Sequence, residues 1–393
     1  MMNMEDQNFS DCSIIMINLD GLRKDKIEKC LSLKTIKEEN VYFSKMISVS
    51  PYTLAAHHSI FSGLYPCQNG VDAYYHMFRF KENVKTFPEI LSKKGFYTKA
   101  DVISENIIPK RGFNEISVFD EKTTNFAIRH SKIIKKIAEN QKFFLFLHYE
   151  GVHSKLLTDI MKKYDPKENE DEYFKNIEEN NNRYDSYLED CEKYVQSIRK
   201  VISEISKNKK IIVIWFADHG TSIGERKGEK FYGVYTYDYT INSFCVIEFP
   251  SKLNKIIDTQ CSLLDFFPLI MNLSGENQFD YKTLPGKNLI ELINSKEKID
   301  EEPIFVETGG LYGYWPSPKR HNIFCVRHND LKLIYNDSNS SWEFYNLILD
   351  PIEKNNIYDE TDLKIRELKE KLMNFLNLNK IKNNLIKEQD FHK

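Results

Sequence analysis

The sequence has no apolar run long enough to cross a membrane. Its first hydrophobic segment, residues 13–19, is seven residues long. No later segment reaches the roughly eighteen apolar residues that a membrane helix needs. The N-terminus carries acidic residues and no basic region ahead of that segment. We therefore expect neither a signal peptide nor a membrane span, and we expect a cytoplasmic location.

Cysteine is scarce, and its spacing is not that of a metal knuckle. The seven cysteines are odd in number and scattered, and no two of them form a CxxC pair. This pattern argues against a disulfide framework and against a structural zinc site. It favours reduced, buried thiols.

The sequence also has no excess of one charge. Its 55 Lys and Arg residues and 58 Asp and Glu residues leave a formal net charge of -3, with a sequence pI near 6.4. A chain with this balance has no global basic field that would attract nucleic acid. We therefore expect no nucleic-acid partner, while an oligomer stays open.

The residues that are present predict a folded protein. Hydrophobic residues make up 41% of the chain, with 26 Phe and 22 Tyr, far from the composition of disordered proteins. A length of 393 residues predicts about two to three domains, or one large core with an appendage. We predict an α/β domain over residues 10–295, and a C-terminal sub-domain with a terminal helix over residues 296–393.

Short apolar runs alternate with helix-like stretches through the first half of the chain. The helix-like stretches include one that ends near Ser32, one that begins after Thr53, and one at 88–96. The alternation predicts an α/β fold with a mixed, mainly parallel central sheet between layers of helices. The last two runs are continuously apolar, which is typical of strands covered on both faces. The runs are residues 13–20, 41–48, 97–103, 143–149 and 211–218.

The rest of the chain predicts an insertion and an antiparallel region. An insertion at about 160–192 begins with residues too polar for a core, which predicts a surface loop, and residues 184–205 then show helical spacing. Residues 261–275 predict a further helix. Residues 303–360 combine aromatic and alternating patterns with turn signals, which predicts a small antiparallel sub-domain. Residues 361–389 have the spacing of an amphipathic helix.

Polar residues follow two of the predicted central strands. Asp20 closes the first strand, and Asp218 with His219 closes the strand at 211–218. In doubly wound sheets, ligands bind at the carboxyl ends of the strands. A single carboxylate at such a place could simply cap the following helix. Two carboxylates and a histidine favour a divalent ion such as Mn²⁺, Zn²⁺ or Mg²⁺.

A threonine hydroxyl stands at another predicted helix start. The free amides and the dipole of the helix after Thr53 would favour an anion. The hydroxyl could serve only as a helix cap. It becomes a competent nucleophile at neutral pH if a divalent ion on Asp20, Asp218 and His219 lowers its pKa.

Six ordered motifs together resemble one family, although each alone is weak. They are NLDGLR (18–23), TLAAHHSIFSGLYP (53–66), FLHYEGVH (146–153), FADHGTSIGE (216–225), CSLLDFFPLIMNLSG (261–275) and WEFYNLILDPIEKNNI (342–357). They span nearly the whole chain and resemble the alkaline phosphatase superfamily, specifically its sulfatase-like branch. The resemblance implies a sulfatase-like catalytic domain over residues 10–295.

The resemblance also implies a metal site and a nucleophile. It makes Asp20, Thr53, Asp218 and His219 the metal ligands and Thr53 the nucleophile. Members with two ions need further histidines, and position 231, where one would stand, is Phe. We therefore favour one ion, of Mn²⁺, Zn²⁺ or Mg²⁺, over two.

Three further residues gain a catalytic role from the resemblance. His153 matches an active-site histidine that protonates the leaving group or contacts the anion. Lys230 resembles a lysine that neutralises a non-bridging oxygen, although a solvated loop would explain it equally well. His57 occupies the place of the sulfatase arginine and could contact the same oxyanion. His148 lies within a predicted strand, and we expect it to be structural.

Departures from the sulfatase pattern direct the functional prediction. Sulfatases carry a Cys or Ser that is converted to formylglycine within C-x-P-S-R, whereas here Thr53 is followed by LAAH. Threonine at this position is typical of members that act on phosphorus esters. We therefore predict a metal-dependent hydrolase of phosphomonoesters, phosphodiesters or phosphonate monoesters that forms a phospho-threonine intermediate.

The substrate prediction is broad, and three alternatives accompany it. The ester would belong to a small molecule or to the head group of a glycan or lipid. The alternatives are a transferase that passes a phospho head group to a glycan or lipid-like acceptor, a sulfuric ester hydrolase, and a non-catalytic binding protein of the same fold.

Overall fold

An eight-stranded sheet forms the centre of the computed structural model, which describes residues 9–72, 79–163, 170–229, 231–276, 283–295, 299–309 and 322–379. The strand order is β10 (Lys255–Ile257), β2 (Val41–Phe43), β9 (Cys245–Glu248), β7 (Ile211–Phe216), β1 (Ser13–Leu19), β6 (Phe143–Tyr149), β4 (Tyr97–Val102) and β5 (Glu115–Val118). The five strands from β7 to β5 run parallel, and β9 is antiparallel to both of its neighbours. The predicted mixed, mainly parallel sheet is confirmed.

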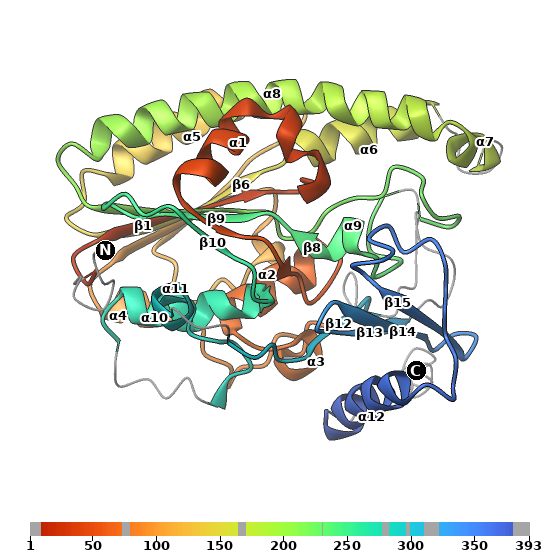
Figure 1. The fold of residues 1–393 in the computed structure, drawn as a ribbon. Helices are drawn as coiled ribbons and strands as arrows, with labels where there is room; N and C mark the ends of the chain where they lie inside the picture. Colours follow the sequence, from red (N-terminus) through yellow and green to blue (C-terminus); the bar gives the residue numbers. More distant parts are fainter. Residues whose placement is uncertain are drawn as a thin grey trace, which may run out of the picture.

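Helices cover both faces of this sheet (Figure 1). One layer contains α1 (Leu31–Glu39), α5 (Phe126–Ile137), α6 (Gly151–Lys163) and α8 (Ile177–Ile205). The other contains α2 (Thr53–Ser62), α4 (Phe87–Lys93), α10 (Phe266–Leu273) and α11 (Leu289–Asn294). Shorter elements are α3 (Pro66–Asn69), α7 (Glu170–Lys175), α9 (Asp238–Ile241) and the 3-10 turns η2 (Lys24–Lys29), η3 (Glu105–Ile107) and η4 (Leu263–Asp265).

The two layers explain why the central strands are continuously apolar. Along β1, Ile15, Ile17 and Leu19 pack into the core under α8, whereas Ile14 and Met16 pack into the core on the α2 side. Successive side chains of a strand point to opposite faces, so a strand with a hydrophobic core on each face needs an apolar residue at every position.

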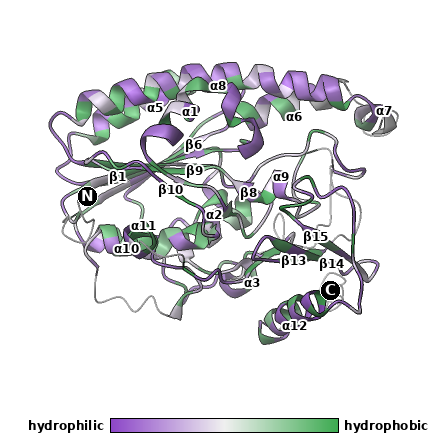
Figure 2. Ribbon diagram, viewed as in Figure 1, coloured by the Kyte–Doolittle hydropathy of each residue, from purple (hydrophilic) through white to green (hydrophobic). Residues whose placement is uncertain are grey.

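The polar segment near residue 180 is helical, so the prediction of a surface loop there is wrong. α8 begins at Ile177 and runs for 29 residues, and α7 precedes it. Its buried face includes Asn180, Tyr184 and Leu188, which recur at helical spacing. Asn180 is tolerated inside because its amide donates to the carbonyls of Tyr173 and Ile223, both at 3.0 Å. The helix alternates between hydrophilic and hydrophobic colour along its length (Figure 2).

Two predicted helices have different bounds in the structure. The residues expected to form a helix ending near Ser32 instead form η2, and α1 starts only at Leu31. The segment 261–275 opens with a short strand and η4 before α10 begins at Phe266. In both places a short 3-10 turn redirects the chain before the longer helix.

The predicted C-terminal antiparallel region is confirmed. β12 (Ile304–Glu307), β13 (Ile323–His328), β14 (Leu331–Asn336) and β15 (Ser341–Asn346) form an antiparallel sheet in that order. The terminal helix, α12 (Leu363–Leu378), packs Leu368 and Leu372 against this sheet. A three-stranded sheet of β11 (Cys261–Ser262), β3 (Met46–Ile47) and β8 (Asn242–Ser243) also forms.

None of the helices in the described part of the chain is both long and apolar enough to cross a membrane.

Candidate active site

Three adjacent parallel strands bring the candidate residues together. β1 lies between β6 and β7 and pairs in parallel with both. The residues that follow these strands therefore meet at one edge of the sheet: Asp20 after β1, Glu150 after β6, and Asp218 with His219 after β7. This is the edge at which doubly wound sheets bind ligands.

The hydroxyl of Thr53 lies within this group. Thr53 is the first residue of α2, where the helix follows the extended residue Tyr52. Its Oγ donates to Asp20 Oδ2 at 3.1 Å, and it lies 3.1 Å from His219 Nε2. His219 Nε2 is also 3.5 Å from Asp20 Oδ1 and 3.7 Å from Asp218 Oδ2. The structure therefore brings together the four residues that the sequence predicts as metal ligands.

The donor set fits a divalent cation. Ligand atoms of Asp20, Asp218 and His219 all lie within 4.8 Å of one another. Both oxygens of Asp218 and Oδ1 of Asp20 are buried and make no hydrogen bond to any described residue. Burying a carboxylate without partners costs several kcal/mol. A carboxylate that capped a helix would accept hydrogen bonds from backbone amides, so these oxygens favour cation binding over a capping role. Hard carboxylate oxygens with one imidazole suit Mn²⁺, Zn²⁺ or Mg²⁺.

His219 is oriented for ligation by its own backbone. Its Nδ1 lies 2.6 Å from the carbonyl oxygen of Gly220, which requires the proton to be on Nδ1. Nε2 then presents its lone pair toward Thr53 and the two carboxylates. A backbone carbonyl commonly fixes the tautomer of a ligating histidine in this way.

His153 faces the same centre from the first turn of α6. Its Nδ1 is 3.1 Å from Glu150 Oε2, and its ring centre is 6.3 Å from that of His219. Burial lowers the pKa of His153, but the carboxylates of Asp20 and Glu150 outweigh it and raise the pKa to about 10. Gly21 makes room for the ring, since a Cβ at that position would lie 3.3 Å from His153 Cβ.

His148 and Glu150 belong to the site, although the sequence did not assign them to it. His148 Nε2 lies 2.8 Å from Asp20 Oδ2 and 3.4 Å from Glu150 Oε1. These contacts place His148 against a predicted metal ligand, and its expected structural role stays a prediction. The sequence feature that could have indicated these contacts is the position of His148, one residue before the end of β6. A polar residue is unusual inside a buried parallel strand, and β6 lies beside β1, which precedes Asp20.

His57 is buried behind Asp218. Its Nε2 is 2.9 Å from the Asn18 amide nitrogen and 3.4 Å from Asp218 Oδ2, and its ring packs edge-on against Phe146. Burial lowers its pKa to about 3. Asn18 Oδ1 accepts from the Asp218 amide at 3.0 Å, so its NH₂ group donates to His57. The side chain is fully buried, so the ring lies beside Asp218 rather than reaching toward solvent.

Lys230 lies outside the described residues. Tyr232, which follows it closely, places its ring 4.7 Å from that of His219 and 4.9 Å from that of His153. An aromatic wall therefore borders the two histidines.

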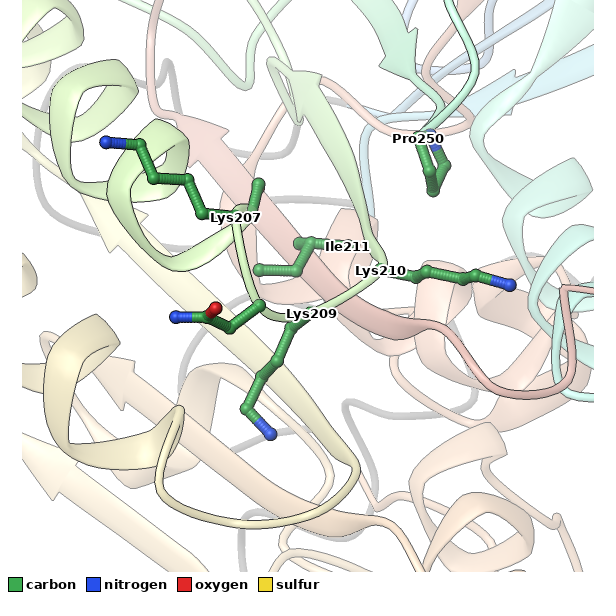
Figure 3. A pocket seen from close by; sticks show the side chains of 7 residues that line it. Lys207, Lys209, Lys210, Ile211 and Pro250 are labelled. Carbon is green, nitrogen blue, oxygen red and sulfur yellow. The ribbon is translucent and has the colours of Figure 1, made fainter.

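A surface hollow of about 360 Å³ lies at the opposite end of β7 and takes no part in this site. It is lined at the start of the strand by Ile211, by Pro250 and by the lysines of the preceding turn. Lys207, Lys209 and Lys210 point in different directions (Figure 3), so they do not converge on one anion.

Solved structures share this fold closely. A 2-O glycosaminoglycan sulfatase superposes with a TM-score of 0.77 at 17% identity, covering 96% of this chain and 94% of that one. A structure in complex with its substrate D-glucosamine-2-N,6-O-disulfate gives 0.74 at 15% identity, with coverage of 95% and 99%. The phosphonate monoester hydrolase of Silicibacter pomeroyi gives 0.69 at 13% identity, with coverage of 94% and 97%. These likenesses confirm the sulfatase-like fold.

A curated relative matches part of the chain. The N-acetylglucosamine-6-O-sulfatase of Bacteroides thetaiotaomicron is 24% identical over 196 residues, which are 46% of this chain. The matched stretch spans only a third of the length of that relative, 33%.

Family models match most of the chain and correct the predicted chemistry. A sulfatase model matches residues 5–276, and a model for the C-terminal part of N-sulphoglucosamine sulphohydrolase matches residues 225–382. Together with the named relative, these matches point to sulfuric esters, so the prediction of phosphorus-ester hydrolysis is wrong. Because the sulfatase model covers more than half of the 393 residues, this protein belongs to the sulfatase family.

Proposed function

We propose that this protein hydrolyses the sulfate ester of a sulfated sugar. The observation that carries the proposal is the Thr53 hydroxyl, which lies 3.1 Å from both Asp20 and His219 in a chain of the sulfatase family. A sugar with a 6-O-sulfate is the first substrate to test. The curated relative is named for such an ester, and one structural neighbour binds a 2-N,6-O-disulfated glucosamine.

Asp20, Thr53, Asp218 and His219 would hold one divalent ion. The three buried carboxylate oxygens that make no hydrogen bond within the described part of the chain support this assignment. Bound there, a Mn²⁺, Zn²⁺ or Mg²⁺ ion would lower the pKa of the Thr53 hydroxyl and stabilise negative charge on the sulfate oxygens.

Thr53 is the proposed nucleophile. The Thr53 hydroxyl gives its proton to Asp20 Oδ2, to which it already donates a hydrogen bond, and its oxygen attacks sulfur. The bond between sulfur and the sugar oxygen breaks, and the sulfuryl group moves to Thr53. Asp20 and His219 hold the oxygen in place from two sides, which lowers the entropic cost of the attack. The N-terminus of α2 adds a favourable field for the anionic substrate.

His153 would protonate the departing sugar oxygen. Glu150 orients its ring by an ion pair at 3.1 Å, and the ring faces the centre that contains His219. In the second step a water molecule gives a proton to His153 and attacks sulfur, the bond between Thr53 and sulfur breaks, and the Thr53 oxygen takes back its proton from Asp20 as sulfate is released. Tyr232, beside both histidines, would form an apolar wall for the sugar.

Threonine determines the form of this second step. The sulfatase motif requires a Cys or Ser for conversion to formylglycine, and Thr53 keeps a plain hydroxyl instead. Release of the group from Thr53 therefore needs attack at sulfur. A sulfated Thr53 should accumulate when that attack is slower than the first step.

The test is sulfate release from N-acetylglucosamine 6-sulfate and p-nitrophenyl sulfate with added Mn²⁺ or Zn²⁺. Thr53→Val keeps the shape of the side chain without the hydroxyl and should lower the rate at least about a thousandfold, while Thr53→Ser keeps part of it. The intact mass of quenched wild type should show one added SO₃ group that Thr53→Val lacks. Faster release from p-nitrophenyl phosphate than from the sulfate esters would overturn the proposal.

A further inference from the structure

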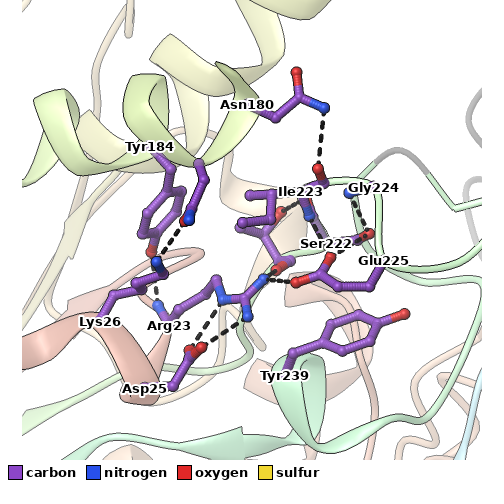
Figure 4. A network of polar contacts seen from close by, with 12 residues as sticks. Arg23, Asp25, Lys26, Asn180, Tyr184, Ser222, Ile223, Gly224, Glu225 and Tyr239 are labelled. Carbon is purple, nitrogen blue, oxygen red and sulfur yellow. Dashed lines mark hydrogen bonds and ion pairs between the residues drawn. The ribbon is translucent and has the colours of Figure 1, made fainter. Parts of the chain in front are cut away.

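A polar network centred on a buried arginine links the two segments that follow the proposed metal ligands (Figure 4). The first segment, residues 21–25, follows Asp20, and the second, residues 221–225, follows Asp218 and His219. Arg23 stands at the centre of the network and is only 5% exposed.

The guanidinium of Arg23 binds both segments. It forms two hydrogen bonds with Asp25, Nε to Oδ1 at 3.0 Å and Nη2 to Oδ2 at 2.8 Å, within its own segment. Across to the second segment, its Nη1 donates to the Thr221 carbonyl at 3.2 Å and forms an ion pair with Glu225. Arg23 thus ties two loops that are about two hundred residues apart in the sequence.

Glu225 completes the link by folding its own loop. Its Oε2 accepts from the Ile223 amide at 2.7 Å and from the Ser222 hydroxyl at 3.2 Å. The carboxylate therefore holds the turn after His219 with one oxygen and Arg23 with the other. Tyr239 closes the network, with its ring 5.6 Å from the Arg23 guanidinium carbon.

The helix α8 anchors both segments to the body of the protein. The Tyr184 hydroxyl donates to the Gly21 carbonyl at 3.0 Å and accepts from the Arg23 amide at 2.7 Å. Four residues earlier, the Asn180 amide donates to the Ile223 carbonyl at 3.0 Å. Residues one helical turn apart thus fix the two loops on a single rigid element.

We propose that Arg23 and Glu225 are positioning residues that set the distance between Asp20 and the Asp218–His219 pair, and thereby the affinity of the site for its divalent ion. The inference rests on the proposed metal site and adds residues that touch neither the ion nor the substrate. A site whose ligands come from two separate loops needs those loops held in register, since small displacements weaken coordination.

The test is Mn²⁺ binding to the metal-free protein, measured by titration calorimetry without substrate. Glu225→Gln keeps the size of the side chain and removes the ion pair. Asp101→Asn is the control: Asp101, on β4, is another carboxylate paired with an arginine, and it receives two hydrogen bonds from Arg129, at 2.8 and 2.7 Å. Both variants should lower the melting temperature.

Glu225→Gln should weaken Mn²⁺ binding about tenfold, and Asp101→Asn should leave the Kd within about twofold of wild type. If Glu225→Gln does not fold, Arg23→Lys is the milder variant whose Mn²⁺ Kd is compared with wild type. It keeps the positive charge but loses the planar guanidinium that binds two partners at once. Equal Kd values for wild type and the Arg23 or Glu225 variants would overturn the positioning role alone. A wild type that binds neither Mn²⁺ nor Zn²⁺ would overturn the metal site and the inference together.

Discussion

The buried acidic site at Thr53 and the buried ion network around Lys332 are neutralised in different ways. In the network, Lys332 pairs with Asp238 at 2.9 Å and Glu353 at 2.7 Å, and Arg327 pairs with Asp238 at 3.2 Å. At the Thr53 site, the basic side chains within 3.7 Å of the buried carboxylates are all histidines among the described residues.

The difference indicates what each cluster does. The network joins the loop at α9 to the antiparallel sheet, since Asp238 belongs to α9 and Lys332 to β14. Its charges are offset from within, which suits a structural connection. At the Thr53 site, the oxygens of Asp218 make no hydrogen bond to any described residue, which suits the cation that we propose there. Buried charge is thus offset within the protein in the network, and we expect a bound cation to offset it at the Thr53 site.

Removing a cation from the network should have the largest effect on stability. Lys332→Met leaves Asp238 and Glu353 buried beside each other, so we expect the free energy of unfolding to fall by about 3–5 kcal/mol. Urea denaturation measures this. Lys369→Met is the control, because its partner Glu360 is largely exposed and the pair should contribute about 0–1 kcal/mol. Equal losses in the two variants would contradict the account of the network.

Adding a cation should stabilise the Thr53 site. Mn²⁺ at about a hundred times its Kd should raise the free energy of unfolding of metal-free wild type by about 3 kcal/mol. The same addition should not stabilise Asp218→Asn. Urea denaturation with and without Mn²⁺ measures both values. Stabilisation of Asp218→Asn equal to that of wild type would place the ion elsewhere.

Removing an unpartnered carboxylate should stabilise the metal-free protein. Asp218→Asn eliminates a buried charge whose oxygens make no hydrogen bond to any described residue, so we expect a gain of about 1 kcal/mol in the presence of EDTA. The sign is opposite to that expected for Lys332→Met. A loss of stability in EDTA would mean that Asp218 is already neutralised from within.

Glu229 is intermediate between the carboxylates of the Lys332 network and those of the Thr53 site. It is a buried carboxyl group whose partners are hydrogen-bond donors and not a cation. It accepts from the amides of Val234 and Tyr235 and from the Tyr239 hydroxyl. Burial raises its pKa to about 8 from the ordinary 4.5. The folded protein therefore keeps this proton between those pH values while the unfolded chain releases it, and stability falls as pH rises through that window.

Glu229→Gln should remove this part of the pH dependence. At pH values near the raised pKa, the variant should exceed wild type in free energy of unfolding by on the order of 1 kcal/mol, because unfolding of wild type is favoured there by release of the Glu229 proton and the variant has no such proton to release. Denaturation midpoints measured across the window check the prediction. An unchanged slope would show that Glu229 titrates near its ordinary pKa.

The ends of the central strands were predictable from the sequence, and so were the residues that follow them. Asp20 and Asp218 each follow a continuous apolar run, and parallel strands place such residues at one edge. Thr53 could be recognised only with the motifs, because a hydroxyl at a helix start also suits a cap. The structure distinguishes these roles through the contacts of its Oγ.

Contacts between distant side chains could not be predicted in the same way. His148 lies inside a strand that has a core on each face, and only the pairing with β1 puts its Nε2 beside Asp20. The Arg23–Glu225 pair depends on the conformations of two loops that the local pattern does not encode.

The wrong prediction of a phosphorus ester has a different cause. A threonine beside a metal site suits attack on sulfur as well as on phosphorus, because both esters are tetrahedral anions.

The most direct test of the central claim is a count of divalent ions per chain, by elemental mass spectrometry after dialysis against Mn²⁺. The claim is that the unpartnered oxygens of Asp20 and Asp218 form a cation site, whereas the paired network does not. We predict one ion in wild type, one in Lys332→Met and none in Asp218→Asn. A wild type without an ion, or an Asp218→Asn variant that retains one, would contradict the account.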